Sequence, residues 1–269
     1  MTTDFQFKKA SDSGHWYTKE AQLIETLPGA KGQQVKPDIR HARKHDLCPG
    51  VTTIIKAADR PALTVYRERQ VLLASLTLTR QPDETDDAWI DRIMQDSREH
   101  AIKAAERGSE LHGYVERELT NSSSTHGHVI AVANELETIA PGCRLSWRSE
   151  LPCVGDLGYA TKSDLSVNRN GQRWVVDIKS KDGPLDELRL WDEHSQQLAA
   201  TRYALATKEP EMIDAKCAIL FLSRTDPQAR IVVATDEQIQ HGWECFKALA
   251  HYWQIKNKHK PTWSKVIYA

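Results

Sequence analysis

Long apolar stretches are missing from this chain of 269 residues. No run approaches the roughly 18 uninterrupted apolar residues that a membrane-spanning helix needs, so we expect no membrane span and no membrane partner. The opening sequence, MTTDFQFKKASDSGHWY, also lacks the charged start and apolar stretch of a secretory signal. The sequence therefore predicts a cytoplasmic protein.

Paired cysteines are missing as well. The five cysteines are an odd number, and none stands in a Cys-x-x-Cys pair. This pattern argues against a zinc ribbon and against a disulfide framework. A chain of this length can bury a sizeable core without such cross-links, so its stability requires no cofactor.

Charge is distributed unevenly along the chain, although the formal net charge is only -1. Residues 31–80 hold ten Lys or Arg against four acids, whereas residues 82–99 hold seven acids and two arginines. From Phe246 onward there are five lysines, no acid, and several Trp and Tyr residues. Lysines among aromatic side chains suit phosphate contact and base stacking, so the two basic segments are candidates for binding a nucleic acid.

The periodicity of apolar residues predicts a single domain, with helices first and a sheet later. Helices are expected from about Pro61, over 86–119 with a break near Gly108, over 129–140, over 186–207, and toward Lys256 after a cap at Asp236. Strands are expected at 144–154, 159–167, 172–180, 215–223 and 229–235, with 168–171 as a hairpin turn between the second and third. Because a strand that follows a crossover helix can rejoin its sheet in parallel, the predicted fold is α/β (α+β), a mixed sheet flanked by helices.

The most informative residues are Asp164 in the second predicted strand and Asp177-Ile178-Lys179 at the end of the third. Asp177 and Lys179 project from the same face of one strand, with the Ile178 carbonyl between them, and the hairpin can bring Asp164 of the neighbouring strand close. Two close carboxylates repel each other unless a cation lies between them, and oxygen ligands suit Mg²⁺ or Mn²⁺. A nearby lysine can position an attacking water or neutralise charge on a phosphate. The alternative is an ordinary ion pair at a strand end.

Six segments in this order resemble the RecB-like, phage-type exonucleases of the PD-(D/E)XK nuclease superfamily. They are PGVTTIIK, PALTVYRER, RGSELHGYVE, SDL, VVDIKSK and SQQLAATRYAL. The resemblance implies a restriction-endonuclease-like core with the element order helix, three strands, helix, strand. It divides the single nuclease domain, 1–269, into a basic N-terminal extension (1–48), a motif-bearing core (49–223), and a C-terminal strand with a basic helix and tail (224–269).

The resemblance also implies a role for each residue of the site. One or two Mg²⁺ or Mn²⁺ ions would be held by His112, Asp164, Asp177 and the Ile178 carbonyl, and Glu116, one helical turn after His112, could support the site or a second ion. Asp164 and Asp177 would be catalytic together with Lys179, the family's lysine. Gln197 would be the glutamine of the helix motif, although Gln196 competes for that assignment.

The chain departs from the family pattern at two positions. Thr201 stands where a tyrosine is common, which leaves the role of Tyr203 open, and Thr161 stands where a glycine is common. Some relatives hold an iron-sulfur cluster through one early cysteine and three late ones. Here only Cys217 and Cys245 are late, so no cluster is expected.

The function implied is a metal-dependent DNA exonuclease that hydrolyses phosphodiester bonds in phage or prophage recombination or in DNA repair, acting on single- or double-stranded ends beside a single-strand annealing protein. The candidate DNA-binding residues are Thr52, Thr53, Lys56, Arg67, Ser180, Lys181 and Tyr203. Two alternatives stay open. One is a structure-specific or endonucleolytic DNase with the same site, and the other is a DNA-binding module without activity.

Overall fold

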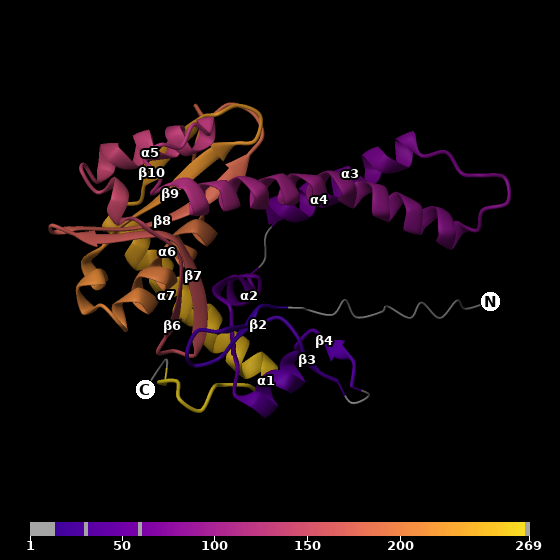
Figure 1. Ribbon diagram of the computed structural model, residues 1–269. Coiled ribbons are helices and arrows are strands. Elements are labelled where there is room, and N and C mark those ends of the chain that lie inside the picture. Colours follow the sequence, from indigo (N-terminus) through magenta and orange to yellow (C-terminus); the bar gives the residue numbers. More distant parts are fainter. Residues whose placement is uncertain (1–13, 30–31, 59–60, 267–269) are drawn as a thin grey trace.

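The computed structural model describes residues 14–29, 32–58 and 61–266. The first thirteen residues of the predicted N-terminal extension therefore lie outside the described residues. The rest forms a five-stranded sheet with helices on both faces, a small lobe at its N-terminal side, and a helical hairpin that extends away from the sheet (Figure 1). The predicted mixed α/β architecture is confirmed. No helix among the described residues is long and apolar enough to cross a membrane.

The sheet has the strand order β10-β9-β8-β7-β6. Its strands are β6 (Arg148–Gly155), β7 (Tyr159–Arg169), β8 (Gln172–Lys181), β9 (Lys216–Ser223) and β10 (Ala229–Val233). All neighbours are antiparallel except β8 and β9, which pair in parallel after the crossover helix α6 (Asp192–Ala206), as predicted. Residues 144–146, expected to begin the first strand, instead form a short 3₁₀ helix.

The predicted turn between β7 and β8 is confirmed. The pairing begins at Arg169↔Gln172, so only Asn170 and Gly171 form the loop. Both have positive φ, 52° and 76°. This is the conformation of a two-residue type I′ turn, which Asn-Gly favours because its twist matches that of the strands. The turn fixes the register on which the site described below depends.

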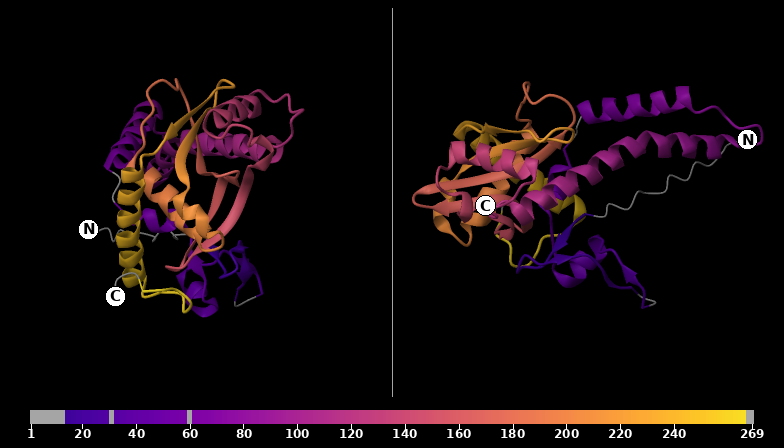
Figure 2. Two further views of the ribbon diagram at one scale, coloured as in Figure 1. Left: turned by 90° about the vertical axis from the view of Figure 1, so that its left-hand side faces the viewer. Right: turned by 45° about the horizontal axis from the view of Figure 1, so that its top comes forward.

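Each face of the sheet has its own hydrophobic core. On one face, α4 (Asp86–Glu118) and α5 (Gly127–Ile139) pack on β7, β8 and β9 through buried residues that include Val115, Leu136 and Leu165. On the other, α6 and α7 (Asp236–Asn257) pack through residues that include Leu198 and Phe246. Figure 2 shows the sheet between these two pairs of helices.

Two helix boundaries differ from the sequence prediction. The helix expected from residue 186 begins at Asp192, because Leu185 is buried and Leu188 and Leu190 pack against the core as an extended segment. Its first turn carries Asp192 and Glu193, which the helix dipole favours. The final helix is capped by Thr235, whose side chain accepts a hydrogen bond from Gln238 N at 3.1 Å, so the predicted cap at Asp236 was wrong by one residue.

The predicted break in α4 near Gly108 was also wrong, because the helix runs without interruption. Gly108 lies where α4 crosses β8, and a Cβ there would lie 2.5 Å from Ser180 Oγ. The glycine thus permits a close approach of helix and strand rather than ending the helix. The part of α4 that precedes Gly108, here called its outer part, extends away from the sheet beside α3 (Pro61–Thr77), and the two form the helical hairpin (Figures 1 and 2). The part from Gly108 onward is called its inner part.

The N-terminal lobe consists of short elements. They are β1 (Trp16–Tyr17), β2 (Leu23–Ile24), β3 (Leu27–Pro28), β4 (Gln34–Val35), α1 (Ile39–His45), β5 (Cys48–Pro49) and α2 (Val51–Ile55). The β-branched run VTTII forms the helix α2, because Val51, Ile54 and Ile55 are buried against the core that α6 and α7 share. The lobe thereby places α2 beside α6, next to the end of β8.

Candidate active site

Two carboxylates meet where the pairing of β7 with β8 stops. The pairing extends from Arg169↔Gln172 to Leu165↔Val176. One further step would place Asp164 opposite Asp177. There the Ile178 N–H donates to Asp164 Oδ2 at 2.8 Å. A side-chain carboxylate thus accepts from the backbone of the neighbouring strand, and the two acids lie side by side where β7 and β8 stop pairing.

Asp177 is held by a lysine on its own strand and a glutamine on α6. Its Oδ2 forms an ion pair with Lys179 Nζ at 2.7 Å, and its Oδ1 accepts a hydrogen bond from Gln197 Nε2 at 2.5 Å. Lys179 Nζ also donates to Gln197 Oε1 at 3.1 Å, which closes a three-residue network. The neighbouring Gln196 is buried, and its Oε1 has no hydrogen-bond partner among the described residues. Of the two glutamines considered from the sequence, Gln197 is therefore the one that contacts Asp177 and Lys179.

Burial and the closeness of charged groups shift the pKa values of two residues in this network, Asp164 and Lys179. Burial, and next the negative charge of Asp177, raise the pKa of Asp164 to about 7. Burial alone would lower the pKa of Lys179, but the adjacent negative charge of Asp177 outweighs it, and the pKa is raised. Lys179 therefore remains an ammonium group at neutral pH.

His112 lies on the inner part of α4, which packs against the sheet. Burial is the largest cause that lowers the pKa of its imidazole, while the charges of Asp177 and Lys179 act on it in opposite directions. Glu116, one helical turn further on, also acts on it. A lowered pKa keeps the imidazole neutral at physiological pH, the form that can coordinate a metal.

Metal binding requires donors with unused capacity. Within the described residues, no three His, Cys, Asp or Glu side chains lie in an arrangement that could hold a metal ion. Asp177 is turned instead toward Lys179 and Gln197. Its buried Oδ2 makes the ion pair without the geometry of a hydrogen bond, and so remains an acceptor with unused capacity. An imidazole, two carboxylates and a carbonyl are a chemically suitable donor set for Mg²⁺ or Mn²⁺, and a cation would relieve the repulsion that raises the pKa of Asp164.

A cavity of about 170 Å³ adjoins the network. It is lined by Thr52, Ile55, Lys56, Lys179, Glu193, His194 and Gln197. Two of the predicted DNA-binding residues, Thr52 and Lys56, thus lie beside the predicted catalytic lysine. Glu193 was missed by the sequence reasoning, although it precedes Gln197 by four residues and so shares its helix face. Its charge also acts on Lys179.

The other predicted DNA-binding residues lie outside this cavity lining. Thr53 is buried, only 8% exposed, and Tyr203 stacks on Trp243 of α7 with ring centroids 3.8 Å apart. The Ser180 Oγ accepts from Arg224 Nη1 at 3.2 Å, and the backbone carbonyl of Lys181 accepts from Arg224 N at 3.0 Å. Arg67 is exposed on α3.

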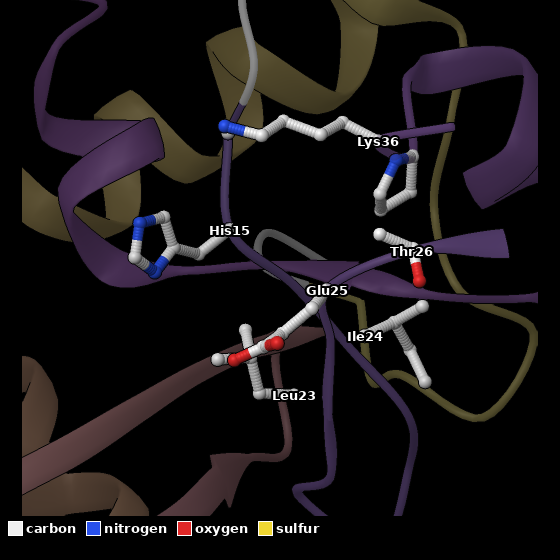
Figure 3. Close-up of a pocket in the computed structure, with 8 residues that line it drawn as sticks. His15, Leu23, Ile24, Glu25, Thr26 and Lys36 are labelled. Carbon is white, nitrogen blue, oxygen red and sulfur yellow. The ribbon is translucent and has the colours of Figure 1, made fainter. Parts of the chain in front are cut away.

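A larger cavity of about 380 Å³ lies in the N-terminal lobe and is lined by Gly14, His15, Leu23, Ile24, Glu25, Thr26, Lys36 and Pro37. Figure 3 shows the charged ends of Glu25 and Lys36 on opposite sides of it, so they do not converge. The titratable side chains gather instead where the pairing of β7 with β8 stops, which makes that cluster the candidate active site.

Comparisons with known proteins do not identify a family. No family model and no curated protein matches the chain. A solved structure described as "Crystal structure of SSO0001" aligns over 72% of this chain and 87% of its own length, with 10% identity and a TM-score of 0.35. A likeness this weak carries no argument about function.

Proposed function

We propose that this protein is a metal-dependent DNA nuclease with a PD-(D/E)XK core, acting as an exonuclease. The observation that carries the proposal is the network in which Asp177 is bound by Lys179 and Gln197 while Asp164 accepts a hydrogen bond from the backbone of Ile178, the residue after Asp177. The order helix, three strands, helix, strand agrees with the core that the resemblance implies. Exonuclease action, processing of DNA ends in recombination or repair, and a single-strand annealing protein as companion follow from that resemblance.

In this proposal, the chain's own residues perform distinct tasks. Asp164, Asp177, His112 and the Ile178 carbonyl would hold Mg²⁺ or Mn²⁺, which supplies Lewis-acid activation of the phosphate and of the attacking water. Lys179, kept protonated by Asp177, stabilises negative charge on the scissile phosphate and orients the water. Because it remains an ammonium group, it does not act as the general base. Gln197 fixes the positions of Asp177 and Lys179.

The neighbouring surface suits a DNA strand. Lys56 and the exposed Thr52 border the cavity beside Lys179. A lysine and a hydroxyl can contact phosphate oxygens without reading base sequence, so we expect little sequence preference.

The proposal is tested with linear DNA labelled at its 5′ or 3′ end and with covalently closed circular DNA, each incubated with Mg²⁺ or with EDTA. The wild type should degrade the linear DNA only with Mg²⁺ and leave the circle intact, and Asp177→Asn should degrade neither substrate. Cleavage of the circle would establish the endonucleolytic alternative. DNA binding without cleavage of any substrate would establish the inactive binding module, and equal degradation by the variant and the wild type would show that the site is misassigned.

A further inference from the structure

Lys162 is a cation beside the candidate active site that neither the motifs nor the cavity includes. It lies on β7, two residues before Asp164. Its neighbour Thr161 hydrogen-bonds Thr201 of α6 at 3.1 Å, so alternation along the strand turns Lys162 toward the opposite face, where α4 lies. Its charge is among those that act on His112. The side chain is 49% exposed, which leaves its ammonium group accessible to a ligand.

Lys162 forms an ion pair with Glu150 on the adjacent strand β6. The backbone of Glu150 is unusual, with φ at 54°. The other described non-glycine residues with positive φ lie in turns, loops or helix caps: Ala21, Asp46, Asn170 and Lys258. Glu150 lies inside a strand, and this left-handed conformation is unfavourable for a residue with a side chain.

The positive φ of Glu150 coincides with a change in the face of the sheet toward which the side chains of β6 point. The β6–β7 pairing includes Ser149↔Leu165 and Leu151↔Ser163, which places Glu150 opposite Asp164. Ser149 Oγ donates to the Glu116 carbonyl of α4 at 3.3 Å, whereas Leu151 packs against the core on the α6 face. The chain therefore changes face at Glu150. Because of this change of face, the Glu150 carboxylate reaches Lys162. The ion pair lies next to Asp164, which is opposite Glu150 in the β6–β7 register.

We propose that Lys162 forms a binding subsite for a backbone phosphate of the DNA strand, adjacent to the scissile phosphate, and that the Glu150 carboxylate occupies this subsite until DNA replaces it. The inference rests on the proposed function, because it requires a phosphodiester strand at the site. A carboxylate and a phosphate offer a lysine the same kind of charge-assisted acceptor. Glu150 thus neutralises the lysine in the free protein and gives way to the phosphate when DNA binds.

The two partners of this ion pair should have opposite effects on DNA binding. The experiment uses the full chain and a short fluorescein-labelled duplex in EDTA, where no cleavage occurs, with anisotropy measured over a range of salt concentrations. Lys162→Ala should weaken binding about fivefold at low salt and reduce the slope of log affinity against log salt by about 0.9, the value for one phosphate contact. Glu150→Gln should tighten binding about twofold, because the competing carboxylate is gone. The double variant should bind like Lys162→Ala.

A variant that keeps the fold separates this subsite from a merely structural ion pair. Glu150→Gly removes the carboxylate and tolerates positive φ, so it should stay folded and bind DNA at least as tightly as the wild type. Unchanged affinity and salt slope in Lys162→Ala, or weaker binding in both folded Glu150 variants, would overturn the proposal. These results are separable from the nuclease assignment: active enzyme with an unaffected Lys162→Ala rejects the subsite alone, and the predicted binding pattern without cleavage rejects the nuclease alone.

Discussion

The inner and outer parts of α4 are held in place in different ways. The inner part lies on the sheet: Val115 is fully buried, and the Glu116 carbonyl accepts a hydrogen bond from Ser149 of β6. The outer part lies beside α3 and away from the sheet. Among the described side chains of that hairpin, only the apolar residues Ala74 and Ile93 are buried, while Leu72 and Leu76 are 64% and 82% exposed.

Polar contacts hold the outer part instead. Arg92 donates from Nε and Nη2 to the Glu84 carboxylate at 2.9 and 2.8 Å, and Trp89 Nε1 donates to the Leu78 carbonyl at 3.1 Å. A side chain on α4 can therefore be held in a fixed position only where the helix packs against the sheet. His112 lies on the supported part, so changes there should alter activity, whereas changes in the outer part should remain local.

The largest expected effect is that of removing a carboxylate from the site. Asp177→Asn should lower the rate of DNA hydrolysis by about 10²–10³-fold or more, the loss typical of removing one group that stabilises transition-state charge. The matched control is Asp91→Asn, on the outer part of α4, which should retain full activity. Initial rates on end-labelled linear DNA, with circular dichroism to verify folding, measure both. Equal losses in the two variants would show that Asp177 has no special part in the reaction.

A smaller effect is expected from Gln197→Ala. This change leaves the charges in place but removes the amide that contacts both Asp177 and Lys179, so kcat should fall about 10- to 100-fold, as for residues that orient metal ligands. Gln196→Ala is the matched control, because that side chain has no hydrogen-bond partner among the described residues at its Oε1. Steady-state kinetics should show a normal kcat for the control. A larger loss in Gln196→Ala would reverse the assignment of the two glutamines.

The crossing of α4 over β8 can be tested by a double-mutant cycle. Gly108→Ala should destabilise the protein by about 1–3 kcal/mol, because its Cβ would overlap Ser180 Oγ. In a Ser180→Ala background that oxygen is absent, and the same change should stabilise the protein by about 0.5–1 kcal/mol through helix propensity. Urea unfolding of the four proteins measures the sign. Destabilisation of similar size in both backgrounds would show that Ser180 does not limit the approach of the helix.

The smallest effect is a pH dependence confined to the outer part. The hydrogen bond from Arg92 is the main cause that lowers the pKa of Glu84 from 4.5 to about 2. Because the folded-state pKa lies below the unfolded value, this contact stabilises the hairpin above about pH 4.5 and is lost as the pH falls toward 2. Hydrogen exchange, corrected for intrinsic rates, should show residues 79–92 opening at pH 3 while residues 108–118 stay protected.

Glu84→Gln provides the control for this pH dependence. Its outer hairpin should already exchange faster at pH 6 and should change little on acidification. Loss of protection in both parts of α4 at the same pH would mean that the helix opens as one unit.

Much of this arrangement was predictable because it depends on local signals. Asn170 and Gly171 specify the turn, the turn sets the register, and the register brings Asp164 to Asp177. The parallel return of β9 followed from the crossover helix. These features needed only residue type and periodicity.

Features that depend on contacts between distant segments were not predictable. Gly108 looked like a helix end until its neighbour across space, Ser180, was known. Thr161 of β7 and Thr201 of α6 are 40 residues apart in the sequence, and only the fold brings their hydroxyl groups within hydrogen-bonding distance. The left-handed backbone of Glu150 had no sequence signal, because glutamate is not a residue that favours positive φ.

The most direct test of the central claim is to locate the metal. Crystals grown with Mn²⁺ and measured for anomalous scattering should show an ion between the carboxylates of Asp164 and Asp177, bordered by the Ile178 carbonyl, with the His112 imidazole directed toward it. Under the same Mn²⁺ concentration the protein should cleave linear DNA. Cleavage at that concentration with no anomalous peak at this position would contradict the account.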